Sequence, residues 1–193
     1  MRARRLLAGF WNYARKGQYK NEKQLQDNNI NVAQDICRFL DIYSVNSLIG
    51  LGSQAEYKRT NGFITEESSL FPETHYASSK IVVSNIFLSY CKSMGIDFKW
   101  LRLFDVYGPG DSKQWFMPYV ITSFLENKAP SLSNCYHLWD YLYIDDACAA
   151  IQCFCENLSI DPGFYNLCSG EHVRLRTIVM LIQHLTSPTV NPV

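Results

Sequence analysis

The sequence has no excess of charge, no long apolar run and little glycine, and each shortage excludes a class of protein. Basic and acidic side chains both number 18, whereas a protein that binds nucleic acid or an anionic membrane surface usually carries a basic excess. No apolar stretch reaches the ~18 residues of a membrane-spanning helix. The ten glycines form no Gly-rich phosphate loop. We therefore expect no nucleic-acid partner and no membrane partner.

Cysteine is not scarce, but the spacing of the cysteines excludes a structural zinc site. The seven cysteines are an odd number, most lie in apolar stretches, and only Cys153 and Cys155 form a close Cys-x-Cys pair. A structural zinc site needs a second pair, so no metal is expected. The basic N-terminus is followed by no cleavable apolar run. We expect buried free thiols in the reducing cytoplasm.

The sequence does contain an alternation of helical and extended patterns. Hydrophobic residues make up 47% of the 193 residues and charged residues 19%, as in a folded globular chain. Amphipathic spacing predicts helices over 22–41, 76–94, 113–127, 145–157 and 173–185. Short apolar or aromatic runs predict strands over 47–52, 97–104, 136–144 and 163–167. This alternation predicts an α/β fold with a parallel sheet.

The sharpest local motif is Tyr76-Ala-Ser-Ser-Lys80, within the second predicted helix. Residues four apart lie on one face of a helix, so the phenol and the ammonium point the same way. A neighbouring cation favours the phenolate over the phenol, whose unperturbed pKa is about 10. Such a pair can exchange a proton with a sugar or alcohol oxygen. The alternative is a surface Tyr and Lys that share helical spacing by coincidence.

Ser53 strengthens the functional interpretation of this pair. It follows the predicted strand 47–52, and the carboxyl ends of parallel strands face the ligand crevice of an α/β sheet. Its hydroxyl is therefore expected to hydrogen-bond the same substrate oxygen that Tyr76 protonates. The segment Leu101-Arg-Leu-Phe-Asp-Val-Tyr-Gly-Pro-Gly110 follows the next helix, and its loop is expected at the same edge of the sheet.

Together these segments resemble the extended short-chain dehydrogenase/reductases of the NAD-dependent epimerase/dehydratase family, which act on nucleotide sugars. Gly52-Ser-Gln-Ala-Glu-Tyr57 is similar to the family's Ser-Ser-x-x-x-Tyr-Gly segment, and Tyr76 with Lys80 matches its catalytic pair. Residues 101–110 resemble its Leu-Arg-x-Phe-Asn-x-Tyr-Gly-Pro loop, and residues 139–146 its Arg-Asp-Phe-x-x-Val-x-Asp segment. The resemblance extends from about Leu6 to Leu185.

The resemblance implies roles for individual residues. Tyr76, Lys80 and Ser53 are the implied catalytic residues, with Tyr76 transferring a proton at a sugar hydroxyl. The implied cofactor is NAD or NADP, with contacts at Leu7, Ala8, Gly9, Asn28, Ser53, Tyr76, Lys80 and Phe104. The implied substrate contacts are Ser53, Tyr76, Asp105 and Trp139. Asp105 and Trp139 stand where the family usually has Asn and Arg, so an expected partner for the substrate phosphate is missing.

The resemblance also implies that the chain is a fragment. A family member has a Gly-rich pyrophosphate loop and a longer substrate-binding lobe, and neither is recognisable here. We expect a partial Rossmann-like, doubly wound parallel sheet that lacks its first βαβ units, with part of a small C-terminal substrate-binding lobe. Residues 1–106 are expected to form the later part of the NAD(P)-binding domain. Residues 107–193 are expected to mix lobe segments with the last Rossmann elements.

Two functions stay open from the sequence. The first is an NAD(P)-dependent epimerase or 4-ketosugar reductase that acts on a nucleotide sugar. Dehydration is disfavoured because Gln54 and Ala55 replace the acidic pair that dehydratases place after the catalytic hydroxyl, and Glu56 is one position off. The second is a non-catalytic remnant or interaction module of the same fold. The apolar residues within 81–94 permit a homodimer, which is common in the family, and equally permit core packing.

Overall fold

The computed structural model describes residues 4–9, 22–58, 60 and 62–186. The chain divides into two compact units. Unit 1 comprises Met1–Phe104 and Cys148–Leu167, and unit 2 comprises Asp105–Ala147 and Cys168–Val193. The chain thus leaves unit 1 after Phe104 and returns to it for one further segment. Each unit has its own buried apolar cluster.

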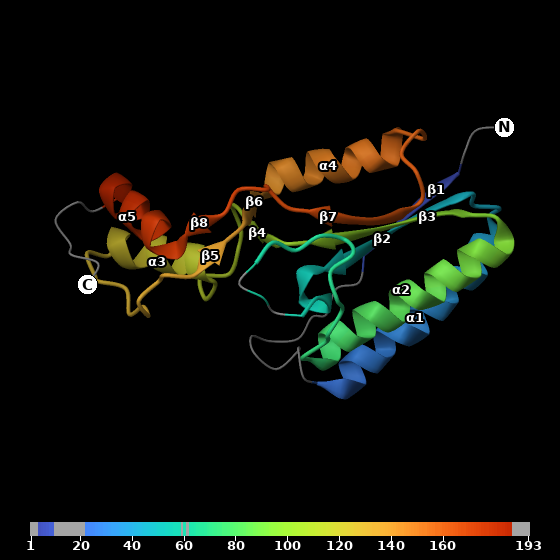
Figure 1. Ribbon diagram of the computed structural model, residues 1–193, viewed down its shortest axis with the longest axis horizontal. Coiled ribbons are helices and arrows are strands. Elements are labelled where there is room, and N and C mark those ends of the chain that lie inside the picture. The colour runs from blue at the N-terminus through green and yellow to red at the C-terminus, as the bar shows by residue number, and fades with distance from the viewer. Residues whose placement is uncertain (1–3, 10–21, 59, 61, 187–193) are drawn as a thin grey trace. The chain divides into compact units, whose positions relative to one another are not determined.

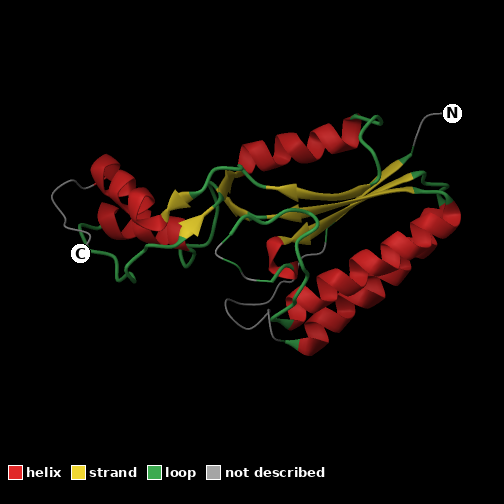
Figure 2. Cartoon of the chain, viewed as in Figure 1, coloured by secondary structure: helices red, strands yellow, loops and turns green. Residues whose placement is uncertain are grey.

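Unit 1 is built on a parallel sheet in the order β1-β2-β3-β7. The strands are β1 (Arg5–Ala8), β2 (Ser47–Ser53), β3 (Asp97–Leu103) and β7 (Gly163–Leu167). The helices α1 (Lys23–Ile42) and α2 (His75–Met94) lie side by side on one face, and α4 (Ile144–Glu156) lies on the other (Figures 1 and 2). The predicted α/β fold with a parallel sheet is confirmed. In the described part of the chain, no helix is both long and apolar enough to cross a membrane.

The boundaries of α2, which carries two of the predicted catalytic residues, follow from its sequence. The Thr74 side chain accepts a hydrogen bond at 3.1 Å from a backbone N–H in the first turn and caps the helix. Gly95, at φ 65°, ends the helix in the left-handed region that favours glycine. Val83, Phe87 and Cys91 are spaced four residues apart and are all buried in the core of unit 1. The helix is therefore held along one face for most of its length.

Trp100 is the largest fully buried side chain among the described residues, and two glycines make room for it. Its indole contacts Phe87 and Phe98, with ring centroids 6.4 and 6.2 Å away. A Cβ at Gly50 would lie 2.4 Å from Trp100 Cε3, and a Cβ at Gly52 would lie 2.3 Å from Trp100 Nε1. The indole on β3 therefore lies directly against the backbone of β2, which only glycine permits at both positions.

Unit 2 combines short strands with two packed helices. Its strands are β4 (Asp105–Tyr107), β5 (Leu138–Trp139), β6 (Tyr141–Tyr143) and β8 (Val173–Arg174). β4 runs parallel to β6, and β5 pairs antiparallel with β8. The helices α3 (Phe116–Leu125) and α5 (Leu175–Thr186) pack on one another. The buried cluster consists of Val120, Phe124, Cys135, Val179 and Ile182.

The sequence predicts one strand over 136–144, whereas the structure has two, β5 and β6, separated by Asp140. The Asp140 carboxylate is buried and accepts hydrogen bonds from the backbone N–H groups of Ser169 and Gly170, at 2.8 and 2.9 Å. β5 pairs with β8 while β6 pairs with β4. The aromatic run 136–144 therefore changes its strand partner at Asp140. The alternation of side chains along the sequence does not reveal this change.

The cysteines are only partly buried, so the prediction of buried thiols is wrong for some of them. All seven are free; Cys37, Cys91 and Cys135 are buried, but Cys148 and Cys153 are exposed. The two exposed thiols lie on α4, where Ala147 is the buried residue and the rest of the helix has a broad accessible face. An apolar sequence context therefore did not ensure burial.

Replacing Gly50 with alanine is expected to destabilise the protein. The added Cβ would stand 2.4 Å from Trp100 Cε3, and overpacking of this kind costs about 1–3 kcal/mol, although alanine is otherwise the better strand residue. Gly62→Ala is the matched control, because the nearest atom to its Cβ would be Thr60 Oγ1 at 3.6 Å. Urea unfolding measures both variants, and equal free energies of unfolding would contradict the packing of Trp100 on β2.

Candidate active site

The carboxyl ends of β1, β2 and β3 lie at one edge of the unit 1 sheet, and this edge carries the candidate site. Ser53, the last residue of β2, is in register with Leu103 of β3, and β1 ends beside Gly50. In open α/β sheets, ligands bind outside this edge. The start of α2 is tied to it, because Lys80 Nζ donates a hydrogen bond to the Leu51 carbonyl oxygen at 2.8 Å.

Ser53 ends β2 and is the N-cap of a short 3-10 helix, η1 (Gln54–Glu56). Its Oγ accepts a hydrogen bond from the backbone N–H of Ala55 at 3.2 Å. A hydroxyl has one hydrogen and two lone pairs, so this contact uses a lone pair and does not use the hydrogen. Ser53 is half-buried at the edge of the sheet. Its hydroxyl is therefore suited to donating a hydrogen bond to a substrate oxygen.

Tyr76 and Lys80 lie on the same side of the first two turns of α2, as their spacing predicts. Lys80 Nζ is 5.7 Å from the centroid of the Tyr76 ring, within the range of a cation–π contact. Tyr76 is half-buried, whereas Lys80 is only 3% exposed. The structure thus brings the three predicted catalytic residues to one place: Ser53 on the end of β2, and the Tyr76–Lys80 pair on the helix bonded to that strand.

The charge of Lys80 is set by two opposing effects. Burial lowers the pKa of Lys80 from 10.5 to about 8, because the low-dielectric interior penalises the charged form, and the negative charge of Glu56 opposes this fall. The ammonium is therefore still protonated in neutral solution. A cation held beside a phenol favours loss of the phenolic proton, so the arrangement suits proton transfer at Tyr76.

Glu56 is a fully buried carboxylate at the end of η1, and the sequence reasoning assigned it no role. Its Oε1 accepts hydrogen bonds from the Ser53 backbone N–H at 2.9 Å and from the Trp100 indole N–H at 3.0 Å. Its Oε2 accepts from Arg102 Nε at 2.8 Å. The carboxylate is thus engaged by β3 and by its own turn. The Ser-x-x-Glu spacing of a capping box is the sequence signal that could have found this contact.

Arg102 connects Glu56 to the far side of β3. Its Nη1 donates to the Tyr57 hydroxyl at 2.8 Å, and that hydroxyl donates to Asn166 Oδ1 at 2.7 Å. The guanidinium also stacks 4.7 Å from the ring centroids of both Tyr57 and Phe164. The buried ion pair is therefore part of a hydrogen-bonded chain that crosses from η1 through β3 to β7.

The predicted cofactor contacts outside the catalytic group are spread over several elements. Ala8 is buried at the end of β1, between the more exposed Leu7 and Gly9. Phe104 is half-buried just after β3, where its backbone N–H donates to the Leu167 carbonyl oxygen at 3.0 Å. Leu7, Ala8, Gly9 and Phe104 therefore lie on strand ends of unit 1, and their contact with a cofactor stays a prediction.

Asn28 lies on the exposed surface of α1, and its role also stays a prediction. The buried polar side chains of this turn are Gln26 and Asn29. Gln26 Oε1 accepts hydrogen bonds from Asn29 Nδ2 and from Ser79 Oγ on α2, both at 3.0 Å. Asn29, next to the predicted residue, is therefore the asparagine that takes part in the polar contact between α1 and the segment that carries Tyr76 and Lys80.

The two predicted substrate residues of unit 2 contact one another. Trp139 Nε1 on β5 donates a hydrogen bond to Asp105 Oδ2 on β4 at 2.5 Å. Burial raises the pKa of the neighbouring Tyr141, and the charges of Asp105 and Asp111 raise it further. The positions where this sequence departs from the family's Asn and Arg thus form an acidic and aromatic pair. Such a pair offers no cation to a phosphate.

A family model described as the NAD dependent epimerase/dehydratase family matches residues 12–168 of the chain. The chain belongs to this family. Membership of the epimerase/dehydratase family accords with the parallel sheet of unit 1, and the roles of Ser53, Tyr76 and Lys80 stay predictions.

Individual relatives in this family share a modest part of the sequence. CDP-abequose synthase of Salmonella typhimurium is 31% identical over 104 residues, which are 51% of this chain and 34% of that protein. dTDP-4-dehydro-6-deoxyglucose reductase of Escherichia coli is 25% identical over 161 residues, which are 79% of this chain and 50% of that protein. The chain therefore spans half or less of the length of these curated relatives.

A solved structure matches most of the chain in its fold. The dTDP-glucose 4,6-dehydratase from Bacillus anthracis, determined in complex with NAD, aligns with a TM-score of 0.77 at 22% identity. The alignment covers 94% of this chain and 56% of that one. At this level of identity the likeness concerns the fold alone, and it confirms the predicted Rossmann-like sheet.

The groups at the strand ends of unit 1 fit the nicotinamide half of a dinucleotide. The Lys80 ammonium and the Ser53 hydroxyl are hydrogen-bond donors at the end of β2, which suits the hydroxyl groups of a ribose. Ala8 ends the adjoining strand β1 and Gly9 follows it, and these small residues let a flat ring approach the backbone there. For the pyrophosphate, the sequence provides no Gly-rich loop.

The pH dependence of stability should report the buried Lys80. The native pKa of about 8 lies below the ordinary 10.5, so the unfolded state binds more protons between these values and stability rises with pH through that window. Relative to Lys80→Met, the wild type should gain roughly 2 kcal/mol of unfolding free energy between pH 7 and pH 9.5. Urea unfolding at several pH values measures this gain. Lys92→Met, on the exposed end of α2, is the control. If the free energies of unfolding of the wild type and of Lys80→Met differ by the same amount at every pH, the pKa of Lys80 is not lowered.

Proposed function

We propose that the chain carries the acid–base centre of an NAD(P)-dependent enzyme that acts on a nucleotide sugar, as an epimerase or a 4-ketosugar reductase. The observation that carries the proposal is the grouping of Ser53, Tyr76 and the buried Lys80 at the carboxyl end of β2. When bound, the nicotinamide supplies or accepts a hydride at the sugar carbon. The residues of this chain move the proton that accompanies it.

In the proposed reaction, Tyr76 gives its hydroxyl proton to a sugar carbonyl oxygen as hydride reaches the carbon, or takes a proton from the sugar hydroxyl in the reverse direction. Ser53 donates a hydrogen bond to the same oxygen and orients it. Lys80, fixed by the Leu51 carbonyl oxygen, keeps a positive charge near the phenol and favours its ionised form. Together they hold the sugar oxygen between two hydroxyl groups while its bond order changes.

The disposition of the carboxylates supports epimerase or reductase chemistry over dehydration. A 4,6-elimination requires a base for the proton on the carbon next to the keto group. Gln54 and Ala55 hold the positions after Ser53 where dehydratases carry acids. Glu56 is fully buried, and its two oxygens are engaged by Ser53, Trp100 and Arg102. Similarity to a 4-dehydro-sugar reductase of Escherichia coli further supports the reductase alternative.

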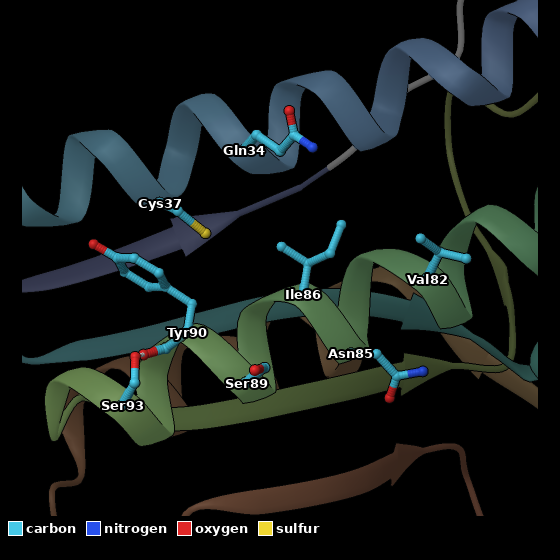
Figure 3. Close-up of a pocket in the computed structure, with 8 residues that line it drawn as sticks. All are labelled: Gln34, Cys37, Val82, Asn85, Ile86, Ser89, Tyr90 and Ser93. Atoms are coloured by element: carbon cyan, nitrogen blue, oxygen red, sulfur yellow. Dashed lines mark hydrogen bonds between the residues drawn. The ribbon is translucent and has the colours of Figure 1, made fainter.

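We also propose that the protein is located in the cytoplasm and that it forms a homodimer. Figure 3 shows a groove between α1 and α2, lined by residues that include Cys37, Val82, Ile86 and Tyr90. Within the stretch 81–94, Val83 and Phe87 are buried in the core, whereas Val82 is exposed. We propose that this groove is covered by a second copy. Sedimentation analysis tests the pairing, and a chain that stays monomeric at high concentration would refute it.

Tyr76→Phe should lower kcat for a nucleotide sugar by about 100-fold or more, because a positioned acid–base group typically contributes that much. The phenylalanine keeps the ring beside Lys80 and removes only the hydroxyl. Tyr43→Phe, on the exposed end of α1, is the matched control and should retain wild-type turnover. Steady-state kinetics with the nicotinamide cofactor measure both variants. Unchanged turnover in Tyr76→Phe would remove Tyr76 from the mechanism.

A further inference from the structure

We propose that Glu56 is a positioning residue for the reaction: its buried carboxylate clamps the backbone of Ser53 and so directs the Ser53 hydroxyl toward the substrate oxygen. The inference rests on the proposed function, because it assigns Ser53 a substrate contact. Glu56 itself has no contact with substrate or cofactor in the proposed function and would act through Ser53. Glu56 lies three residues after Ser53 and reaches back to it across the single turn of η1.

The clamp consists of two hydrogen bonds that both involve Ser53. Glu56 Oε1 accepts from the Ser53 backbone N–H at 2.9 Å, and Ser53 Oγ accepts from the Ala55 backbone N–H at 3.2 Å. The first bond fixes the backbone of Ser53 at φ −151° and ψ 147°. The second occupies one lone pair of the hydroxyl. Because both bonds involve Ser53 and oppose rotation, the hydroxyl hydrogen is limited to directions away from the turn.

The carboxylate itself is held on several sides. Trp100 Nε1 donates to Oε1 at 3.0 Å, and Arg102 Nε donates to Oε2 at 2.8 Å. A Cβ at Gly52 would lie 2.5 Å from Oε1, so the absence of a side chain at this glycine makes room for the bond. A buried carboxylate with such partners has little freedom to move. The position of Ser53 is therefore coupled to β3 through Glu56.

Charge gives Glu56 a second effect on the same site. Its negative charge opposes the fall in the pKa of Lys80 that burial produces. The clamp on Ser53 and the charge that supports the ammonium thus come from one side chain. Replacing Glu56 should therefore change the kinetics through Ser53 and through Lys80.

The decisive experiment is a double-mutant cycle of Glu56→Gln and Ser53→Ala. Glutamine has the size of glutamate and can still accept one hydrogen bond, but it lacks the charge that strengthens the bond to Ser53. Glu56→Gln should lower kcat by about 10-fold in the wild-type background. In the Ser53→Ala background the loss should be clearly smaller, about 3-fold or less, because residues that act as a unit are non-additive and only the effect of the Glu56 charge on Lys80 remains there. An equal loss in both backgrounds would overturn the proposal.

Amide hydrogen exchange at Ser53 tests the clamp without substrate or cofactor. The Ser53 N–H should be protected in the wild type and should exchange about 10-fold faster or more in Glu56→Gln, since a bond to a charged acceptor is lost. Asp140→Asn is the matched control, because Asp140 is also a buried carboxylate that accepts backbone N–H bonds, but from Ser169 and Gly170 in unit 2. It should leave exchange at Ser53 unchanged.

Two outcomes remain decisive if Glu56→Gln fails to fold or if the protein turns over no nucleotide sugar. Glu56→Asp keeps the charge for Arg102 but is one methylene shorter, so exchange at the Ser53 N–H should again accelerate. Rapid exchange of this N–H in the wild type would refute the clamp directly. If the Ser53 N–H is protected in the wild type and loses this protection in Glu56→Gln or Glu56→Asp, the clamp is supported even when no tested sugar is turned over. The lack of turnover would then count against the proposed function alone.

Discussion

The Glu56 carboxylate and the Arg102 guanidinium form a fully buried ion pair, and the geometry at the carboxyl end of β2 depends on it. Removing one partner of such a pair typically costs about 3–5 kcal/mol, because the other charge is left buried without compensation. The pair is tolerated because hydrogen bonds from Trp100 and Ser53 satisfy the remaining capacity of the carboxylate. Gly52 belongs to the same constraint, since a side chain there would occupy the space of Trp100 and of Glu56 Oε1.

The chemistry of the site follows from what this constraint holds in place. Ser53 ends β2 with its backbone N–H bound to Glu56, and Lys80 reaches from α2 to the Leu51 carbonyl oxygen on the same strand. One strand end therefore positions both a hydroxyl and a buried ammonium. The helical spacing sets Tyr76 beside Lys80, whose Nζ lies 5.7 Å from the centroid of the Tyr76 ring. The site combines a rigid sheet edge with the first turns of a capped helix.

Local patterns predicted most of the fold, and long-range contacts account for what they missed. The helices at α1 and α2, the buried strands β2 and β3, and the Tyr76–Lys80 pair follow from periodicity and spacing, which are local. The switch of partners at Asp140 depends on pairing with β8 and β4, far away in the sequence. The contact between Asp105 and Trp139 depends on how the strands of unit 2 pair. The burial of Asn29 rather than Asn28 depends on the rotation of α1, and a shift of one residue along the helix changes which side chain faces inward. Glu56 is intermediate: its capping-box spacing is visible in the sequence, but its partners on β3 are not.

The most direct test of a nicotinamide-dependent reaction at this site is a single-turnover measurement of the absorbance of reduced nicotinamide. The protein, loaded with NAD(H) or NADP(H), is mixed with a nucleotide sugar or with its 4-keto form. A redox step at the sugar predicts a change in this absorbance in the wild type and a much slower change in Ser53→Ala. Bound cofactor whose absorbance stays constant with every nucleotide sugar and 4-ketosugar tried would contradict an epimerase or reductase.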